Sequence, residues 1–250
     1  MAGHSKFKNI MFRKGAQDKK RAKLYSKLGK EITVAAKLGM PDPDHNPRLR
    51  TAIVTAKSHS MPKDNIKRAI EKASGNDSEN YEEVRYEGYG PGKVAIIIEA
   101  LTDNRNRTVA EIRGAFNKGG GNLGDSNSVS YNFERIGQIK YNADVTDEDG
   151  MLEAALEAGA DDVESSDLGH LIYCQPSEFG KIQSVLETSI GEPALAGLEW
   201  RALNTVKVQE NDAKALFELL DVLDDLDDVQ SISANYEIDD QIAEALGFDL

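Results

Sequence analysis

Apolar residues recur every three or four positions through the first third of the chain, which is the spacing of one face of an amphipathic helix. The pattern predicts a helix over residues 16–38, a second helix with Asn46 as N-cap and Pro47 in its first turn, and a third that begins at Pro62. The apolar positions expected to be buried are Leu24, Leu28, Ile32, Ala35, Leu38, Leu49, Ile53, Ala56, Ile66 and Ile70. The three helices together predict a small helical domain.

After residue 81 the pattern changes to short apolar strands that alternate with helices. Residues 84–89 and 94–98 flank a Gly-Pro-Gly turn and predict a hairpin. The second strand is apolar throughout, so we expect it to be central in its sheet. A helix over 107–117 and a strand over 128–133 are predicted next.

The following stretch predicts the order βαββαβ, which is that of a ferredoxin-like domain. Its expected elements are strand 138–141, helix 147–158, strands 162–164 and 170–174, helix 176–188 and strand 198–203. A strand at 205–208, a helix at 213–223 and a strand at 229–236 come last, and they form an α+β layer only by joining the earlier strands. The sequence therefore predicts an α+β protein with domains 1–78, 79–135 plus 204–250, and 136–203, the last inserted in the second.

Charge is divided unevenly along this chain. Residues 1–75 carry 18 Lys and Arg against 6 Asp and Glu, whereas the remaining 175 residues carry 12 against 37, which gives the net charge of −13. An acidic protein ordinarily repels nucleic acid. Basic charge gathered in one segment is nevertheless the electrostatic pattern of phosphate contact, so the uneven division favours a nucleic-acid partner for the N-terminal end.

Lysines on the first predicted helix recur at helical spacing on a face other than the apolar one, and we expect them to be exposed to solvent. A solvated helix face is the alternative interpretation, but such faces ordinarily intersperse Glu with Lys, and residues 1–40 hold 11 basic and 2 acidic residues. The residues predicted to contact phosphates are Lys6, Lys8, Arg13, Lys14, Lys19, Lys20, Arg21, Lys23, Lys27 and Lys30.

A second candidate site follows the apolar strand at 94–98. Two arginines at the start of a helix oppose the helix dipole unless an anion is near, and a capped turn with exposed arginines is an equally open interpretation. Its residues are Asp103, Asn104, Arg105, Arg107 and, from the glycine-rich segment 119–124, Asn122. The glycines there are compatible with close approach of a ligand or with a tight turn.

Other chemistry has little support in the sequence. The four histidines and single cysteine lack metal-ligand spacing, no glycine cluster has the layout of a nucleotide-binding loop, and no nucleophile lies beside a recognisable base. We therefore predict a protein that is not an enzyme and that uses no metal or cofactor. Cys174 lies in a predicted buried strand and is expected to be inert. Without an apolar span or signal segment, the expected location is the cytoplasm.

Several ordered segments resemble the YebC/PmpR family. They are residues 1–6, 9–10, 13–14, 35–39, 46–50, 61–66, 86–92, 101–108 and 120–124. The resemblance implies a helical N-terminal domain and two ferredoxin-like α+β domains, one inserted in the other, around a central cavity. The chain departs from the family pattern at Phe7, where Trp is typical, at Phe12, commonly polar, and at 125–127, where Thr-Asp-Gly is usual.

The resemblance implies two kinds of function. Bacterial members are described as DNA-binding transcriptional regulators, while a mitochondrial relative activates translation of a cytochrome oxidase subunit and some bacterial members resemble ribosome-associated factors. We accordingly predict a nucleic-acid-binding regulator of gene expression, foremost a DNA-binding transcriptional regulator. The alternatives are a translation factor that binds ribosomal or transfer RNA, and an adaptor whose acidic domains bind a basic protein. Electrostatics alone does not distinguish DNA from RNA.

Overall fold

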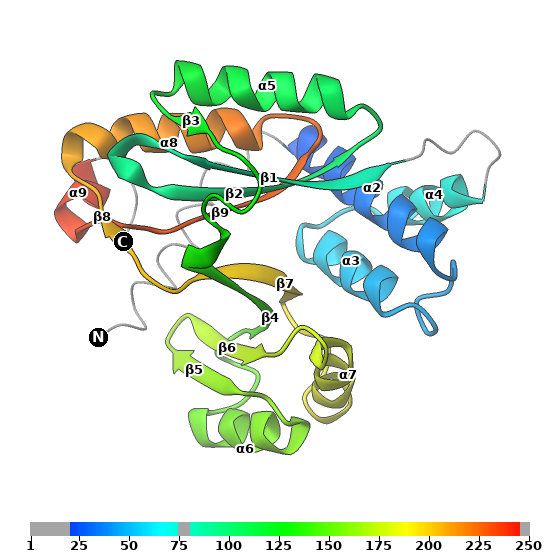
Figure 1. Ribbon diagram of the computed structural model, residues 1–250. Helices are drawn as coiled ribbons and strands as arrows, with labels where there is room; N and C mark the ends of the chain where they lie inside the picture. The colour runs from blue at the N-terminus through cyan, green and yellow to red at the C-terminus, as the bar shows by residue number, and fades with distance from the viewer. Residues whose placement is uncertain (1–20, 75–80, 246–250) are drawn as a thin grey trace. The chain divides into compact units, whose positions relative to one another are not determined.

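The computed structural model describes residues 21–74 and 81–245, which form helices and two four-stranded sheets (Figure 1). The described residues divide into two compact units, one of residues 21–27, 81–134 and 200–245 and one of residues 28–74 and 135–199. An N-terminal helical region followed by α+β structure is the predicted fold class, which is thereby confirmed. The predicted domain boundaries stay a prediction.

The helical region consists of three helices joined by short turns. They are α2 (Arg21–Leu38), α3 (Pro47–Ser58) and α4 (Lys63–Ala73). Asn46 is the N-cap of α3, as predicted: its side-chain oxygen accepts from the Leu49 amide at 3.1 Å, and its amide nitrogen donates to the carbonyls of Ala35 and Met40 at 2.8 Å. This one buried side chain therefore closes the end of α2 and begins α3.

Burial in the helical region follows the predicted apolar face in part. Five of the ten predicted positions are buried, namely Ile32, Ala35, Leu49, Ala56 and Ile66, and four are half-buried, namely Leu24, Leu28, Ile53 and Ile70. Leu38, in the last turn of α2, was predicted to be buried but is 69% exposed, because the helix ends there and the chain turns away at Gly39. The helical periodicity therefore continues one turn beyond the packed face.

The first sheet has the strand order β3-β1-β2-β9 with antiparallel neighbours. Its strands are β1 (Glu82–Tyr89), β2 (Ala95–Thr102), β3 (Asn122–Leu123) and β9 (Val229–Ala234). The predicted hairpin is confirmed, with the short 3-10 helix η2 (Pro91–Lys93) at its turn. Strand β2 is central, and Ile96, Ile97 and Ile98 are all buried because both faces of the sheet are covered.

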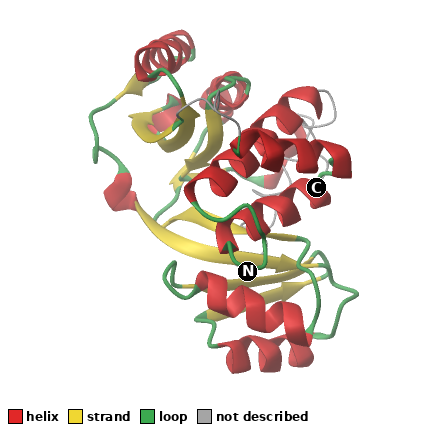
Figure 2. Ribbon diagram, turned by 90° about the vertical axis from the view of Figure 1, so that its right-hand side faces the viewer, coloured by secondary structure: helices red, strands yellow, loops and turns green. Residues whose placement is uncertain are grey.

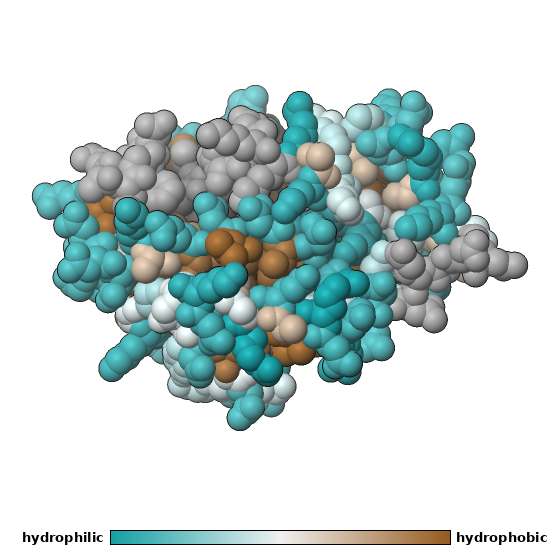
Figure 3. Space-filling model, turned by 90° about the horizontal axis from the view of Figure 1, so that it is seen from above, coloured by the Kyte–Doolittle hydropathy of each residue, from teal (hydrophilic) through white to brown (hydrophobic). Residues whose placement is uncertain are grey.

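Two helices cover one face of this sheet, above it in Figure 1. They are α5 (Arg105–Lys118) and α8 (Glu210–Asp224). Ile96 and Ile98 from β2 pack there with Phe116 of α5 and with Leu216 and Leu219 of α8. The outer face of α5 is hydrophilic, as the view from above shows (Figure 3).

The opposite face of the first sheet is covered by a loop and the 3-10 helix η3 (Ser130–Asn132). Val129 and Phe133 pack there on Ala95 and Ile97. The strand predicted over 128–133 is therefore wrong: residues 130–132 are 3-10 helix, and the strand begins only at Phe133. The cause is the buried carboxylate of Glu87, whose Oε2 accepts from the amides of residues 129 and 130, both at 2.9 Å, so that these amides do not join a strand ladder.

The second sheet has the order β5-β6-β4-β7 and confirms the predicted βαββαβ, ferredoxin-like unit. Its strands are β4 (Phe133–Tyr141), β5 (Asp162–Ser166), β6 (Gly169–Cys174) and β7 (Leu195–Ala202). Helices α6 (Glu148–Ala158) and α7 (Phe179–Ser189) lie side by side on one face (Figure 2). Ile139 and Ile172 from the sheet pack there with Met151 and Ile182 from the helices.

The remaining elements are short. They are β8 (Val206–Lys207), β10 (Tyr236–Glu237) and α9 (Asp240–Ala245), and β8 pairs with β10 in parallel. None of the described helices has the length and apolar character needed to cross a lipid bilayer. Among the described residues, no group of three or more His, Cys, Asp or Glu side chains is placed to hold a metal ion.

Candidate nucleic-acid interface

Four of the ten predicted phosphate-binding residues lie on the described part of α2. They are Arg21, Lys23, Lys27 and Lys30. The other six lie in residues 1–20, outside the described residues; they are Lys6, Lys8, Arg13, Lys14, Lys19 and Lys20. Arg21 and Lys23 are exposed and Lys30 is half-buried.

Lys27 contradicts the expectation that every lysine of this row is exposed. Only 8% of the residue is exposed, and its ammonium donates to the main-chain oxygen of Asp224 and lies 3.2 Å from the Asp224 carboxylate. Lys23 donates to the main-chain oxygen of Asp225 at 2.9 Å. Two lysines one helical turn apart therefore bind the carboxyl end of α8.

The chemistry of a helix end explains this contact. The last carbonyls of a helix have no partner within the helix and carry the negative end of the helix dipole, so cations are favoured beside them. The α8 end adds a run of aspartates, Asp221, Asp224, Asp225, Asp227 and Asp228, which deepens the negative potential. Sequence spacing gave no sign of this contact, because the partners of Lys27 lie 197 positions away.

Helix α4 carries basic residues that the sequence prediction left out. Its exposed basic residues are Lys63, Lys67, Arg68 and Lys72, and its buried side holds Ile66. The Thr33 hydroxyl of α2 donates to the Ala69 carbonyl of α4 at 2.9 Å, so the two helices are packed together. The separation of apolar from basic positions along 63–73 was the signal that could have identified this face.

The charge on α4 is only partly neutralised within the helix. Lys67 lies 3.8 Å from the Glu71 carboxylate, with both side chains mostly exposed, and Asp64 is the other acidic residue of the helix. Exposed pairs of this kind are weak and are screened by salt. Four cations against two carboxylates leave α4 with a net positive exposed face.

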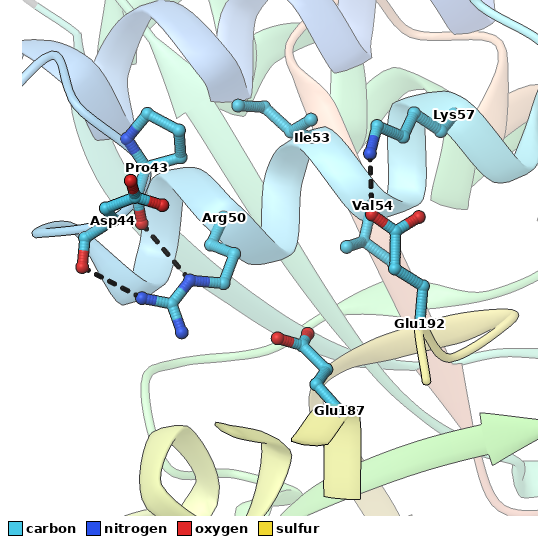
Figure 4. A pocket seen from close by; sticks show the side chains of 8 residues that line it. All are labelled: Pro43, Asp44, Arg50, Ile53, Val54, Lys57, Glu187 and Glu192. Atoms are coloured by element: carbon cyan, nitrogen blue, oxygen red, sulfur yellow. Dashed lines mark hydrogen bonds and ion pairs between the residues drawn. The ribbon is translucent and has the colours of Figure 1, made fainter. Parts of the chain in front are cut away.

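A pocket of about 420 Å³ lies beside α3 in the second unit (Figure 4). Its lining residues are Pro43, Asp44, Arg50, Ile53, Val54, Lys57, Glu187 and Glu192. Arg50 donates to the carbonyls of Pro43 and Asp44 and to the Ser184 hydroxyl, at 2.9 to 3.1 Å, and Lys57 lies 2.8 Å from the Glu192 carboxylate. Both cations of the pocket thus already have acceptors in the protein.

The second candidate site is a tightly bonded corner at the start of α5. Asn104 is the N-cap, and its side chain accepts from the Arg107 amide at 3.1 Å. The Arg107 guanidinium donates to Asp103 at 2.8 Å and to the buried Asp228 at 2.7 Å. Arg105 lies 3.6 Å from the Glu82 carboxylate.

Asp228 is the anion beside the arginines at the start of α5, where their positive charge would otherwise oppose the helix dipole. Its Oδ2 accepts from Arg107 and from the hydroxyls of Thr108 at 2.8 Å and Thr102 at 3.1 Å. The hydrogen bond to Asp228, followed by that to Asp103, raises the pKa of the Arg107 guanidinium. An internal carboxylate therefore balances the positive charge near the helix dipole.

Asn122 does not lie with the other four residues. It pairs with Tyr89 at the end of β1 opposite to Glu82 and Thr102. The neighbouring glycines are required by packing: a Cβ on Gly121 would lie 2.5 Å from the Tyr89 carbonyl, and one on Gly119 2.8 Å from Leu219. Of the two interpretations of segment 119–124, tight internal packing accounts for these positions.

Comparison with known proteins gives two family matches and similarity to solved structures. The family model described as the TACO1/YebC protein N-terminal domain matches residues 5–76, and the model described as the TACO1/YebC second and third domain, named for transcriptional regulation, matches residues 81–236. The crystal structure of a conserved hypothetical protein, Aq1575 from Aquifex aeolicus, is similar with 48% identity and a TM-score of 0.79, over 90% of this chain and 92% of that one. The family models together cover most of the sequence, and the chain belongs to the TACO1/YebC family.

Proposed function

We propose that this protein is a non-enzymatic, nucleic-acid-binding regulator of gene expression that contacts phosphates through its N-terminal basic helices. Membership of a family named for transcriptional regulation supports the regulatory part of the proposal. The observation that carries the binding part is the exposed basic face of α4, packed on α2, within an otherwise acidic protein.

The charge division explains how an acidic protein would bind nucleic acid in one orientation. Residues 1–75 carry three times as many basic as acidic residues, 18 against 6, while the rest of the chain is acidic. Phosphates would be attracted to the helical end and repelled by the α+β domains. Such contacts fix position and orientation and carry no base specificity of their own.

The α2 contacts divide the predicted residues into two roles. Lys23 and Lys27 bind the end of α8, so they contribute to folding in this structure. Arg21 and Lys30 on α2 and the four basic residues of α4 would then make the phosphate contacts, together with the basic residues of the first 20 positions.

Salt dependence of binding tests the phosphate contacts. We would measure the affinity for a duplex DNA and for a structured RNA by fluorescence anisotropy over a range of salt concentration. The variant changes Lys63, Lys67 and Lys72 to Gln. If all three contact duplex phosphates, the slope of log affinity against log salt falls by about 2.7, at about 0.9 for each contact.

A matched control separates this local contact from overall charge. Changing Lys181, Lys207 and Lys214 to Gln removes the same charge from exposed positions of the α+β regions. Equal losses in the two variants would place the contact elsewhere than α4, and absence of binding by the wild-type protein to both probes would overturn the proposal.

The regulatory target needs a measurement in cells. Ultraviolet crosslinking followed by parallel sequencing of attached DNA and RNA distinguishes the two expected targets. Enrichment of discrete promoter DNA supports a DNA-binding transcriptional regulator, the first of the predicted functions. Enrichment of ribosomal or transfer RNA supports a translation factor instead.

A further inference from the structure

The ring of Tyr131 is exposed to solvent on the face of the first sheet opposite to α5 and α8. It is 67% exposed, and no other described Phe, Tyr or Trp residue is exposed. It lies in η3 between Val129 and Phe133, which are both buried against β2. The segment therefore directs one large ring outward while its two neighbours hold it to the sheet.

Several hydrogen bonds fix this ring in place. The Glu87 carboxylate accepts from the amides that begin η3, and the Asn132 carbonyl accepts from the Leu203 amide at 2.8 Å. The Tyr131 hydroxyl lies 3.0 Å from the Tyr89 hydroxyl, within hydrogen-bond distance, and the Tyr89 hydroxyl donates to the Ser128 carbonyl at 3.2 Å. An exposed ring held in this way loses little conformational entropy when a ligand stacks on it.

The surroundings of Tyr131 are rich in neutral polar groups. Asn122 is opposite Tyr89 in the β1–β3 register and so projects from the same face of the sheet. Asn127 is exposed and accepts from Arg85 at 2.9 Å, and the Arg85 guanidinium lies 5.0 Å over the ring of Trp200. Across 122–132 the sequence has several amides and hydroxyls but one carboxylate, Asp125.

This combination is the chemistry that recognises an unpaired nucleobase. Aromatic rings stack on a base of any identity, and amide side chains hydrogen-bond to base edges. Exposed cations lie toward the same end of the sheet: Lys93 is in the β1–β2 turn, and Lys118 ends α5 just before β3. A base within a duplex is already stacked, so the site fits a single strand.

We infer that Tyr131, with Tyr89 and the amides of Asn122 and Asn127, forms a stacking site for one base of a single-stranded nucleic acid. The inference rests on the proposed nucleic-acid function and adds a base contact to its phosphate contacts. It also makes single-stranded RNA, or locally opened DNA, the ligand of this site, because duplex DNA does not present a free base face.

The test uses the full-length chain and a single-stranded RNA of about 12 nucleotides, within the usual site size for such contacts, with 2-aminopurine at its centre. Tyr131→Ala removes the ring, whereas Tyr131→Phe keeps it and removes the hydroxyl. We expect Tyr131→Ala to lower RNA affinity about 5-fold to 150-fold, the range for loss of one stacked base, and to abolish quenching of 2-aminopurine fluorescence. Tyr131→Phe should retain the quenching.

Leu156→Ala is the matched control, because Leu156 is also 67% exposed but lies on α6 in the other unit. Circular dichroism of each variant tests whether the fold is kept. Affinity for duplex DNA and its salt slope should be unchanged in Tyr131→Ala, since no phosphate contact is lost.

The outcomes separate this inference from the proposed function. If Tyr131→Ala binds the RNA like the wild type while the three-lysine α4 variant loses affinity, the stacking site is refuted and the phosphate-binding proposal stands. If Tyr131→Ala and Leu156→Ala lose RNA affinity equally, the effect does not belong to Tyr131 and the stacking site is again refuted. If the wild type binds neither RNA nor duplex DNA, both are overturned.

Discussion

Lys27 offers the sharpest separation between a folding role and a binding role in this protein. We expect Lys27→Met to destabilise the fold and to leave nucleic-acid affinity within about twofold of the wild type. Methionine keeps the length of the buried stem and removes only the ammonium, which donates to the Asp224 carbonyl and lies 3.2 Å from its carboxylate.

The size of the effect follows from these two contacts. A hydrogen bond to a charged group is worth about 1.5–3 kcal/mol, and the value lies at the lower end here because the Asp224 side chain is 53% exposed and water can replace the lost donor. The carboxylate pair adds at most about 1 kcal/mol for the same reason. The sum is about 2 kcal/mol, or a decrease in Tm of about 4–8 °C for a chain of this size.

Calorimetry and fluorescence anisotropy on the same preparation test both halves of this prediction. Lys23→Met is the matched comparison, because the Lys23 side chain is 50% exposed and its loss from a helix end should cost about 0.3–1 kcal/mol. A Lys27→Met protein with unchanged Tm and lost affinity would falsify the structural role and restore Lys27 to the phosphate-binding set.

Three further predictions concern packing and charge away from α2. Burial raises the pKa of Cys174 from 9.0 to about 11, so less of the thiol is ionised at a given pH in the folded protein. Alkylation of the native protein at pH 8 should therefore be about 100-fold slower than in urea, and equal rates would contradict this. The free energy of unfolding should also fall as the pH rises from about 9 through about 11. Gly169→Ala should lower the free energy of unfolding by more than about 2 kcal/mol, as measured by urea titration. The φ of Gly169 is +122°, and the Cβ of an alanine there would lie 2.3 Å from the Tyr141 carbonyl oxygen. A change under about 0.5 kcal/mol would refute this clash. Asp228→Asn should lower the free energy of unfolding by about 1–3 kcal/mol in the same assay, because the carboxylate accepts hydrogen bonds from two threonine hydroxyls. Asp227→Asn, at an exposed position, should change this free energy by less than about 0.5 kcal/mol, and equal effects of the two variants would argue against the buried network.

The sequence predicted the elements that depend on residues close together in the chain. The apolar run 94–98 indicated a central strand, and Asn46 indicated a helix start, because an apolar run and a capping side chain each involve only a few neighbouring residues. The βαββαβ order was readable for the same reason.

Contacts between residues far apart in the sequence account for the parts of the structure that were not predicted. Val129, Tyr131 and Phe133 are apolar or aromatic at every second position, which is the sequence pattern of a strand. Glu87, 42 positions before Val129, accepts from the amides that such a strand would need, and Tyr131 is exposed while its two neighbours are buried. Lys27 fits a solvent-exposed row by its spacing, and only the fold brings Asp224 to it. In the candidate interface, periodicity assigned the faces of the helices, but it did not show that Lys23 and Lys27 bind the end of α8.

Asn127 shows how a departure from the family pattern is accommodated. Its φ is +66°, in the left-handed region where glycine is favoured, and the family resemblance has glycine in this position. Asparagine is among the few other residues that adopt this region readily. The substitution therefore keeps the turn and adds a side-chain oxygen that accepts from Arg85.

The pairing of β2 with β9 has a consequence for the order in which this chain assembles. Ile98 and Ile232 are paired across 134 positions, so the first sheet closes only after a long loop is ordered. Glu134 and Arg201 lie 2.7 Å apart, so the ends of the intervening segment meet once residues 135–199 have folded. Folding of that segment first roughly halves the loop that remains, which lowers its closure entropy by about 0.6 kcal/mol and speeds closure by about threefold. Early folding of residues 135–199 thus shortens the loop that pairing of β2 with β9 must close.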